Sequence, residues 1–122
     1  DQYFKAYSGV LAFQDKMLKS DEIVTAGGRR WKNLEAGSIK KYNYPIQGTA
    51  AEGLKEALAI LLSRINEDWL LVNVVHDEIV LEVPSAEAAK AEKILKESMI
   101  EGMRRLIKDV PVIVDVRTSE HW

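Results

Sequence analysis

Two β-prone runs, separated by only three polar residues, limit the fold of this chain more than any other feature. Residues 69–75 are apolar and rich in β-branched side chains except at Asn73, which suits a strand that is buried on both faces. Residues 79–83 alternate in the pattern of a second strand, which Pro84 ends. The strands can pair only if residues 76–78 connect them, so the sequence predicts an antiparallel hairpin.

The tip of this hairpin, His76-Asp77-Glu78, lacks the Asn-Gly or Asp-Gly dipeptide that tight hairpins favour. Adjacent carboxylates repel each other unless a cation lies between them, and Mg²⁺ prefers oxygen ligands. Asp77 is therefore a candidate metal ligand and Glu78 a weaker one. For so short a motif a solvated turn is the commoner explanation, and a single histidine such as His76 is more often structural or solvent-facing. The tripeptide alone leaves both interpretations open.

Three elements are expected before this hairpin. Apolar residues at helical spacing predict an amphipathic helix over residues 1–19. A Gly-Gly pair between short β-prone pieces predicts a small hairpin over residues 24–31. Residues 38–42 are a candidate for a short helix that ends before Pro45.

A longer helix is predicted from its apolar stripe, which ends at about Asn66. Thr49 and Glu52 have the spacing of a capping box, whereas Pro45 suits a first helical turn. These two starts differ by about one turn, and the sequence does not decide between them.

The last part of the chain predicts a helix from Ser85 and a final strand over residues 110–116. The order is helix, hairpin, helix, strand, strand, helix, strand. This order predicts an α+β fold in which helices pack on a small antiparallel sheet. The 122 residues suit a single domain with a real hydrophobic core.

The composition excludes several classes of protein. With 47% hydrophobic and 30% charged residues, the chain is expected to be globular rather than disordered. It contains no apolar run long enough to span a membrane and no signal-peptide pattern at its start. The sequence begins with Asp1 instead of methionine, which predicts a fragment or a processed chain. The absence of cysteine excludes disulfides and thiolate metal sites and makes the cytoplasm the default compartment.

Net charge does not point to nucleic acid, because the formal value is −2. Basic residues nevertheless form local clusters, each of which is either a solvated face or a phosphate site, the former being commoner. The clusters consist of Arg29, Arg30 and Lys32, of Lys40 and Lys41, and of Arg104 and Arg105.

Several ordered motifs resemble one known family. PIQGTAAEGLK at residues 45–55, followed by VVHDEIVLEV at residues 74–83, resembles the C-terminal palm region of family A, DNA polymerase I-like enzymes. The segments YFKAYSGV, TAGGRRW and SEHW are similar to further motifs of that family in the same order. The resemblance runs almost the length of the chain and implies a partial polymerase palm.

The resemblance implies a role for each matching residue. Asp77 would be one of two palm aspartates that hold catalytic Mg²⁺, with Glu78 as a supporting carboxylate. His76 would lie near the 3′ end of the primer. Gln47 and Asn43 would contact the minor groove of primer–template DNA close to the terminal pair, where acceptors are present on every base pair.

Further partners follow from the same resemblance. Arg29 and Arg30 would face the backbone of the duplex. The complete enzyme would use two Mg²⁺ ions to stabilise the attacking and leaving oxygens, with deoxynucleoside triphosphates as its other substrate and no membrane. A chain of this kind would act in the cytoplasm or, if a phage encodes it, in the cytoplasm of the host.

The sequence departs from the family pattern at three positions. Glu52 stands where the family usually has aspartate, and Ser119 where its closing motif has glycine. Ile39 occupies a place where an arginine that reaches DNA is expected, and Lys40 or Lys41 are the available substitutes.

Other parts of the family's enzymes have no counterpart in this sequence. These parts are the first catalytic aspartate, the fingers helix that holds the incoming nucleotide, and the thumb. The chain is therefore expected to be a DNA polymerase fragment that is inactive alone and is completed by a missing segment or a partner chain. The alternative is a polymerase-derived, non-catalytic DNA- or protein-binding module, which would not need Asp77.

Overall fold

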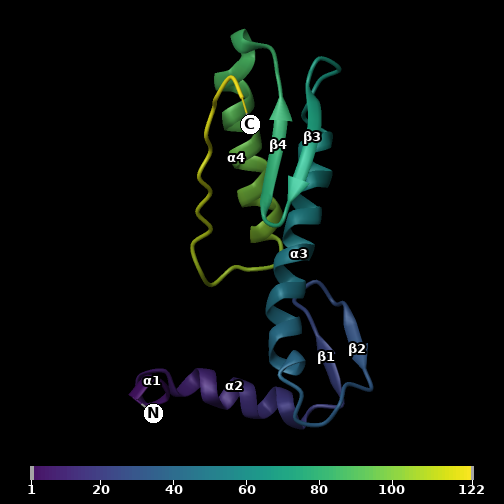
Figure 1. Ribbon diagram of the computed structural model, residues 1–122, viewed down its shortest axis with the longest axis vertical. Coiled ribbons are helices and arrows are strands. Elements are labelled where there is room, and N and C mark those ends of the chain that lie inside the picture. Colours follow the sequence, from purple (N-terminus) through teal and green to yellow (C-terminus); the bar gives the residue numbers. More distant parts are fainter. Residues whose placement is uncertain (1, 122) are drawn as a thin grey trace. The chain divides into compact units, whose positions relative to one another are not determined.

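The computed structural model describes residues 2–121 and divides the chain into two compact units, one up to Thr49 and one from Ala50 onward. Helix α3 contributes residues to both units. Helices and two antiparallel strand pairs together confirm the predicted α+β fold class. Figure 1 labels every element except the short turn η1; the elements are α1 (Gln2–Ala6), α2 (Ser8–Lys19), β1 (Glu22–Val24), β2 (Arg30–Lys32), α3 (Lys40–Leu62), β3 (Leu70–Val75), β4 (Glu78–Glu82), η1 (Ser85–Glu87) and α4 (Ala88–Arg104).

The first helix is interrupted where the sequence predicted continuity. Tyr7 separates α1 from α2 and has a non-helical ψ of 59°. Ser8 and Gly9 follow it, and both residue types are weak formers of helix interiors. The ring of Tyr3 contacts those of Phe4 and Tyr7, with centroids 5.3 and 5.1 Å away. The aromatic residues therefore pack mainly on one another, and no described residue of α1 or α2 is fully buried.

The predicted small hairpin is confirmed as β1 paired with β2. Ile23 of β1 is buried and lies opposite Trp31 of β2. The backbone N–H of Thr25 donates to the carbonyl of Arg29, and the N–H of Arg29 donates to the Thr25 hydroxyl, both at 2.9 Å. Gly28 has a φ of +94°, a conformation that glycine adopts without steric cost. These contacts close the turn.

The end of α2 is held by a buried lysine. Lys41 is only 5% exposed, and its ammonium donates to the carbonyls of Leu18 at 3.2 Å and Ser20 at 2.8 Å. The last carbonyls of a helix lack partners within the helix, and a cation there also opposes the helix dipole. Lys41 therefore has a structural role in this unit.

Both predicted starts of α3 are wrong, because the helix begins at Lys40 and absorbs the short helix expected over residues 38–42. Pro45 lies inside the helix and removes one backbone hydrogen bond, the one to the carbonyl four residues earlier. Thr49 is not a cap, since its hydroxyl donates to the carbonyl of Pro45 at 2.6 Å. The helix ends at Leu62, earlier than Asn66.

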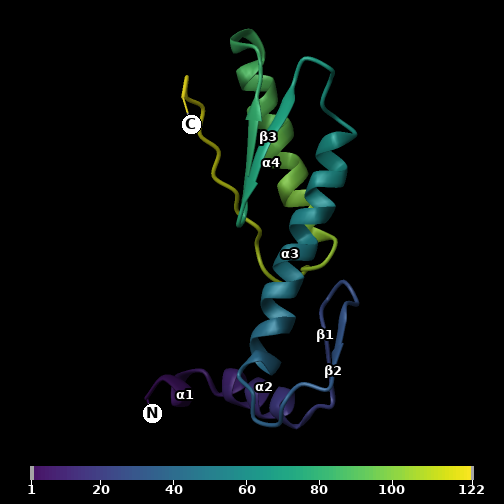
Figure 2. The same ribbon diagram turned by 45° about the vertical axis from the view of Figure 1, so that its right-hand side comes forward.

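In the second unit, β3 and β4 form the predicted antiparallel hairpin beside α4 and the later part of α3 (Figures 1 and 2). The ladder pairs Val74 with Ile79 and Val75 with Glu78. A register irregularity between Leu71 and Asn73 places an extra residue in β3.

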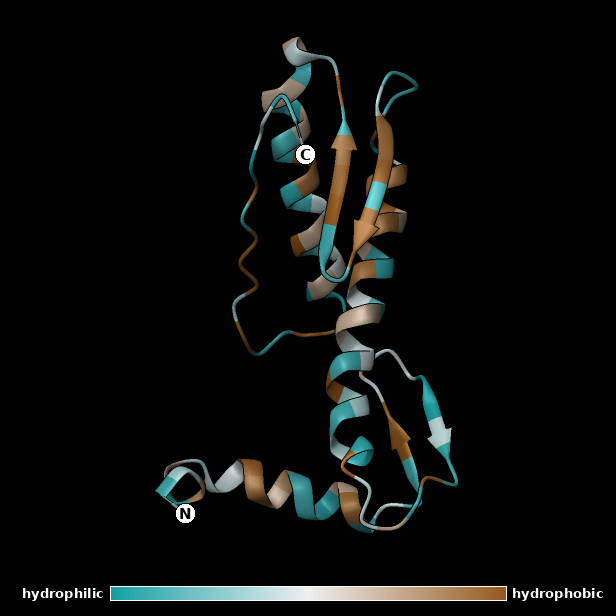
Figure 3. Ribbon diagram, in the orientation of Figure 1, coloured by the Kyte–Doolittle hydropathy of each residue, from teal (hydrophilic) through white to brown (hydrophobic). Residues whose placement is uncertain are grey.

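Burial of β3 differs from the sequence prediction. The strand alternates between exposed and half-buried residues instead of being covered on both faces. Leu70 and Val72 are 56% and 53% exposed, although Figure 3 shows apolar residues along both strands. Within the described residues, α3 and α4 lie beside this sheet, and part of β3 remains exposed.

The core of the second unit joins the helices to the hairpin. Apolar burial is greatest at residues from α3, from the loop before β3, from β4 and from α4. These residues are Ala57, Ile60, Leu61, Trp69, Ile79 and Ala91. The predicted last helix is confirmed as α4, preceded by the single turn η1.

Residues 110–116 do not form the predicted final strand, because they have no regular secondary structure. A strand needs a hydrogen-bonded neighbour, and none of the described residues pairs with this segment. Its side chains still alternate between half-buried and exposed from Val112 to Val116.

No described helix combines the length and the apolar character that crossing a membrane requires.

Candidate functional site

The acidic tip of the second hairpin lies where the sequence predicted it. His76 and Asp77 form the turn between the ladder partners Val75 and Glu78, and Glu78 is the first residue of β4. His76, Asp77 and Glu78 are all exposed to solvent. The φ of His76 is +54°, and a positive φ at the first turn residue is what tight hairpin turns require. The chain thus presents two consecutive carboxylates at the hairpin tip, Asp77 in the turn and Glu78 at the start of β4.

Packing directly below the tip fixes its position. Ile79 follows Glu78 and is buried, and its ladder partner is Val74. Because a hydrogen-bonded strand pair, anchored by the buried Ile79, ends at the turn, Asp77 is carried by an ordered element instead of a long loop. A metal ligand requires this kind of support if its geometry is to be reproducible.

The carboxylates at the tip fit part of the coordination sphere of Mg²⁺. Asp77 and Glu78 supply exposed carboxylate oxygens, and Mg²⁺ commonly uses one or two protein carboxylates together with water and phosphate oxygens. Among residues 2–121, no group of three or more His, Asp or Glu side chains is placed to hold a metal ion. The remaining protein ligands would have to come from outside the described residues.

Asn43 and Gln47 belong to the first unit. They lie four residues apart on α3, which places them on the same face of the helix. Gln47 is exposed and Asn43 is half-buried. Both side chains carry amides, which donate and accept hydrogen bonds, and this pair can therefore contact an acceptor-rich groove.

Arg29 and Arg30, in the turn and at the start of β2, have different local partners. The guanidinium of Arg29 lies 5.8 Å from the centre of the Trp31 ring, a cation–π geometry. Arg30 donates to a carboxylate oxygen of Glu22 at 2.9 Å, and its side chain remains 63% exposed. Both arginines are therefore accessible, but part of the charge of Arg30 is balanced across the hairpin.

The substitutes for the expected arginine at position 39 are unequal. Lys41 is buried and bonded to carbonyls, so its ammonium is not free to reach a phosphate. Lys40 is exposed at the first residue of α3. Of the two, only Lys40 remains a candidate for a contact with DNA.

Sequence reasoning missed the contact between the turn of the first hairpin and α3. The backbone N–H of Ala26 donates to the Thr49 hydroxyl at 3.0 Å. The sequence does contain one sign of this contact, which is Gly48. A glycine inside a helix lowers helix stability by about 1 kcal/mol relative to alanine and often marks a place where another segment packs against the helix backbone. The interpretation of Thr49 as a cap concealed this signal.

Arg105 has a structural role. It bonds Glu56 of α3 at 2.8 Å and Glu101 of α4 at 3.3 Å, and Arg64 also bonds Glu101. The hydrogen bond from Arg64 lowers the pKa of Glu101, and the hydrogen bond to Glu56 raises the pKa of Arg105. This network joins α3 to α4 within the second unit.

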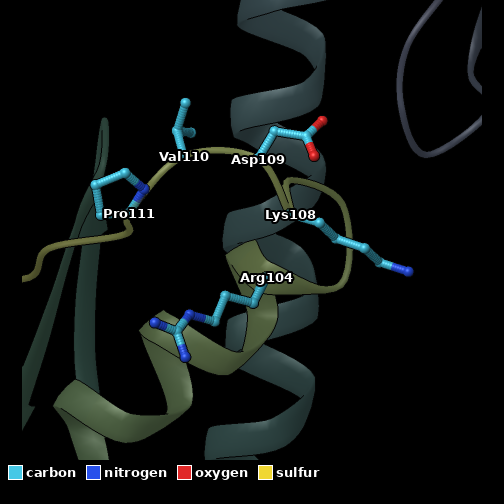
Figure 4. A pocket seen from close by; sticks show the side chains of 5 residues that line it. All are labelled: Arg104, Lys108, Asp109, Val110 and Pro111. Carbon is cyan, nitrogen blue, oxygen red and sulfur yellow. The ribbon is translucent and has the colours of Figure 1, made fainter.

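The neighbouring residue Arg104 lines an open hollow with Lys108, Asp109, Val110 and Pro111 (Figure 4). The side chains of Arg104 and Lys108 point in different directions in Figure 4, so they do not converge on one ligand. Their position at and after the end of α4 also suits the negative end of the helix dipole. The solvated-face interpretation of this basic cluster therefore accounts for Arg104.

The predicted site residues fall into two sets. His76, Asp77 and Glu78 lie together in the second unit. Asn43 and Gln47 lie on α3 in the first unit. The turn next to Arg29 belongs to the same unit and is hydrogen-bonded to α3 through Thr49.

This chain is similar to known proteins over its whole length. The model of the family described as DNA polymerase family A matches residues 1–122. DNA polymerase I of Aquifex aeolicus is 41% identical over 129 residues, which cover 100% of this chain and 22% of that protein. Thermostable DNA polymerase I of Thermus aquaticus is 34% identical over 137 residues, covering 100% and 16%. DNA polymerase theta of Caenorhabditis elegans is 29% identical over 134 residues, covering 98% and 8%. The chain thus spans less than a quarter of the length of each of these relatives.

Proposed function

This chain belongs to DNA polymerase family A, and we propose that it supplies part of the active site of a DNA-directed DNA polymerase. The observation that carries the proposal is the exposed Asp77 on a tight turn between two paired strands, next to the buried Ile79. In the proposed enzyme, Asp77 contributes carboxylate oxygens to a magnesium site and Glu78 supports it. A second aspartate, from outside this chain, completes the ligands.

Two Mg²⁺ ions, when bound, stabilise the attacking and leaving oxygens of an in-line displacement. The contribution of this chain is to hold the carboxylate of Asp77 at a fixed position. We place His76 beside the 3′ end of the primer, because it is exposed and adjacent to Asp77 on the same turn.

The proposed DNA contacts come from the first unit. The amides of Asn43 and Gln47 bind acceptors in the minor groove of primer–template DNA, which every base pair presents. Arg29 and Arg30 approach the phosphate backbone. Their exposure on the first hairpin supports this part of the proposal. Such contacts position a duplex without reading its sequence.

The complete assembly uses primer–template DNA and deoxynucleoside triphosphates, and the rest of the polymerase comes from a further segment or a partner chain. We propose that the isolated 122-residue chain does not extend a primer, because Asp77 and Glu78 do not make a complete ligand set. Detectable template-dependent extension by the purified chain would refute this. The bacterial relatives favour the cytoplasm as its compartment and lend no support to a phage origin.

The decisive experiment completes the enzyme. The matching segment of Aquifex aeolicus DNA polymerase I is replaced by this chain, which aligns with it over its full length. The hybrid should extend a primer, and Asp77→Ala should lower the rate at least about a hundredfold, since losing even a supporting group of a metal site costs tenfold to a hundredfold. Binding of primer–template DNA should change by less than about threefold, because Asp77 contacts metal and not DNA.

The matched control is Asp68→Ala in the same hybrid, because Asp68 is an exposed aspartate outside the hairpin tip. Its extension rate should stay within about twofold of the parent, as surface substitutions change little. Equal rates for the Asp77 and Asp68 variants would contradict the proposal. They would favour the alternative, a non-catalytic DNA- or protein-binding module that uses the first unit alone.

A further inference from the structure

We propose that Thr49 is a positioning residue that fixes the turn of the β1–β2 hairpin to α3, so that Arg29 and Gln47 bind one DNA duplex as a single rigid surface. This inference rests on the proposed DNA contacts of those two residues. It assigns a separate task to Thr49, which lies outside the metal site and is itself 8% exposed.

The hydroxyl of Thr49 both donates and accepts a hydrogen bond. It donates its one proton to the carbonyl of Pro45 at 2.6 Å and accepts the backbone N–H of Ala26 at 3.0 Å. The first bond orients the oxygen within α3, and the second joins that oxygen to a residue 23 positions earlier in the chain. A valine of the same shape can form neither bond.

Gly48 allows the close approach that this bond requires. A Cβ on residue 48 would lie 2.6 Å from Cγ2 of Thr25 and 2.8 Å from Cη2 of Trp31. The hairpin therefore packs directly against the helix backbone at this point, and any side chain there would push it away. The glycine and the threonine together form the attachment point.

The attachment reaches the two DNA-contacting residues through short, ordered connections. On the hairpin, Ala26 lies within the turn closed by the two hydrogen bonds between Thr25 and Arg29. On the helix, Gln47 lies two positions before Thr49 in continuous helical structure. The relative position of Arg29 and Gln47 is therefore set where Ala26 meets Thr49.

Nuclear magnetic resonance on the isotope-labelled full chain tests this inference. Wild type, Thr49→Val and Thr49→Ser are each titrated with a short primer–template duplex, following the backbone amides of Arg29 and Gln47. In wild type both amides should report the same dissociation constant. In Thr49→Val the two constants should separate, with the one at Arg29 higher by about fivefold, the effect of losing one ordinary hydrogen bond. Thr49→Ser, which keeps the hydroxyl, should restore a common value.

A second readout needs no DNA. Exchange of the Ala26 amide with solvent should become about fivefold faster in Thr49→Val and return toward wild type in Thr49→Ser, because that amide loses its acceptor. Exchange at Thr25, whose amide bonds Arg29, is the internal control. If the valine variant does not fold, Thr49→Ala replaces it, as it also lacks the hydroxyl and cannot overfill the site.

The possible failures are distinguishable. A common dissociation constant in Thr49→Val, equal to that of wild type, would overturn the role of Thr49 while leaving the DNA contacts intact. Different constants at Arg29 and Gln47 in wild type would show that they do not form one surface. Absence of any saturable shift in wild type would overturn the proposed DNA contacts themselves, and the inference with them.

Discussion

Gly102 of α4 lies against Ala57 of α3 so closely that a Cβ on residue 102 would be 2.6 Å from the Cα of Ala57 and would also overlap its backbone nitrogen. Backbone, not a flexible side chain, occupies the space. The two helices beside the β3–β4 hairpin therefore meet here at two small residues. The contact sets how near α4 can approach the later part of α3.

Gly102→Ala should accordingly destabilise the chain. Forcing a methyl group into a packed contact costs about 1–3 kcal/mol, so the urea midpoint should fall. Gly9→Ala in α2 is the matched control, because nothing lies within 4 Å of its added Cβ. That change should be neutral or stabilising by up to about 1 kcal/mol, the helix-propensity difference. An unchanged midpoint in Gly102→Ala would contradict the observed approach.

Magnesium should bind locally at the hairpin tip even in the isolated chain. Titration with Mg²⁺ or Mn²⁺ should produce saturable changes at the amides of His76, Asp77 and Glu78, at millimolar concentrations because the ligand set is partial. Asp77→Ala should abolish them, and Asp15→Ala on α2 should not. Unlocalised changes that never saturate would indicate that the metal site does not exist in this chain by itself.

Acid should weaken the joint between α3 and α4 through Glu101. The hydrogen bond from Arg64 lowers the pKa of Glu101 below its ordinary value of 4.5, so the folded state favours the ionised carboxylate. The resulting stabilisation is fully present above that value and is lost as the pH falls through the lower, folded-state pKa. Urea midpoints measured between about pH 6 and pH 3 should therefore decline toward acid, in the range where carboxylates titrate.

Glu101→Gln should make that decline shallower, because the substituted side chain no longer takes up a proton. Glu67→Gln is the comparison, as Glu67 is an exposed carboxylate in the loop after α3. The same steepness in the wild type and the Glu101 variant would exclude Glu101 as a source of the acid sensitivity.

The backbone at His76 predicts a conflict between stability and function. Its φ of +54° is costly for a residue with a Cβ. His76→Gly should therefore raise the free energy of unfolding by up to about 1 kcal/mol, which would appear as a higher melting temperature. Asn33→Gly tests the same backbone effect away from the tip, since Asn33 has a φ of +59°. In the completed enzyme, only the His76 change should also slow primer extension. Equal rates of primer extension for the two variants would contradict the proposed role of His76 at the active site.

The hairpin at residues 70–82 was predictable because its signal is local. Period-2 alternation, a terminating proline and a connection of only a few residues leave one way to pair the strands. The position of Asp77 on the turn follows directly from that pairing. Its role does not, because a metal site requires ligands that lie far apart in sequence.

The failed predictions share the opposite property. Thr49 matched a local capping pattern, yet its hydroxyl accepts a bond from Ala26, a long-range partner that spacing cannot reveal. Residues 110–116 have the alternation of a strand, but alternation does not supply the neighbouring backbone that a strand needs. The predicted burial of β3 assumed a second covering layer that the described residues do not provide.

The open side of β3 has a consequence for handling the chain. Leu70 and Val72 are exposed, and no third strand pairs with this sheet anywhere in residues 2–121. An uncovered apolar edge is a template on which other copies can add as strands. Protein concentration would then govern how long a purified sample stays dispersed, and aggregation would begin at this uncovered strand.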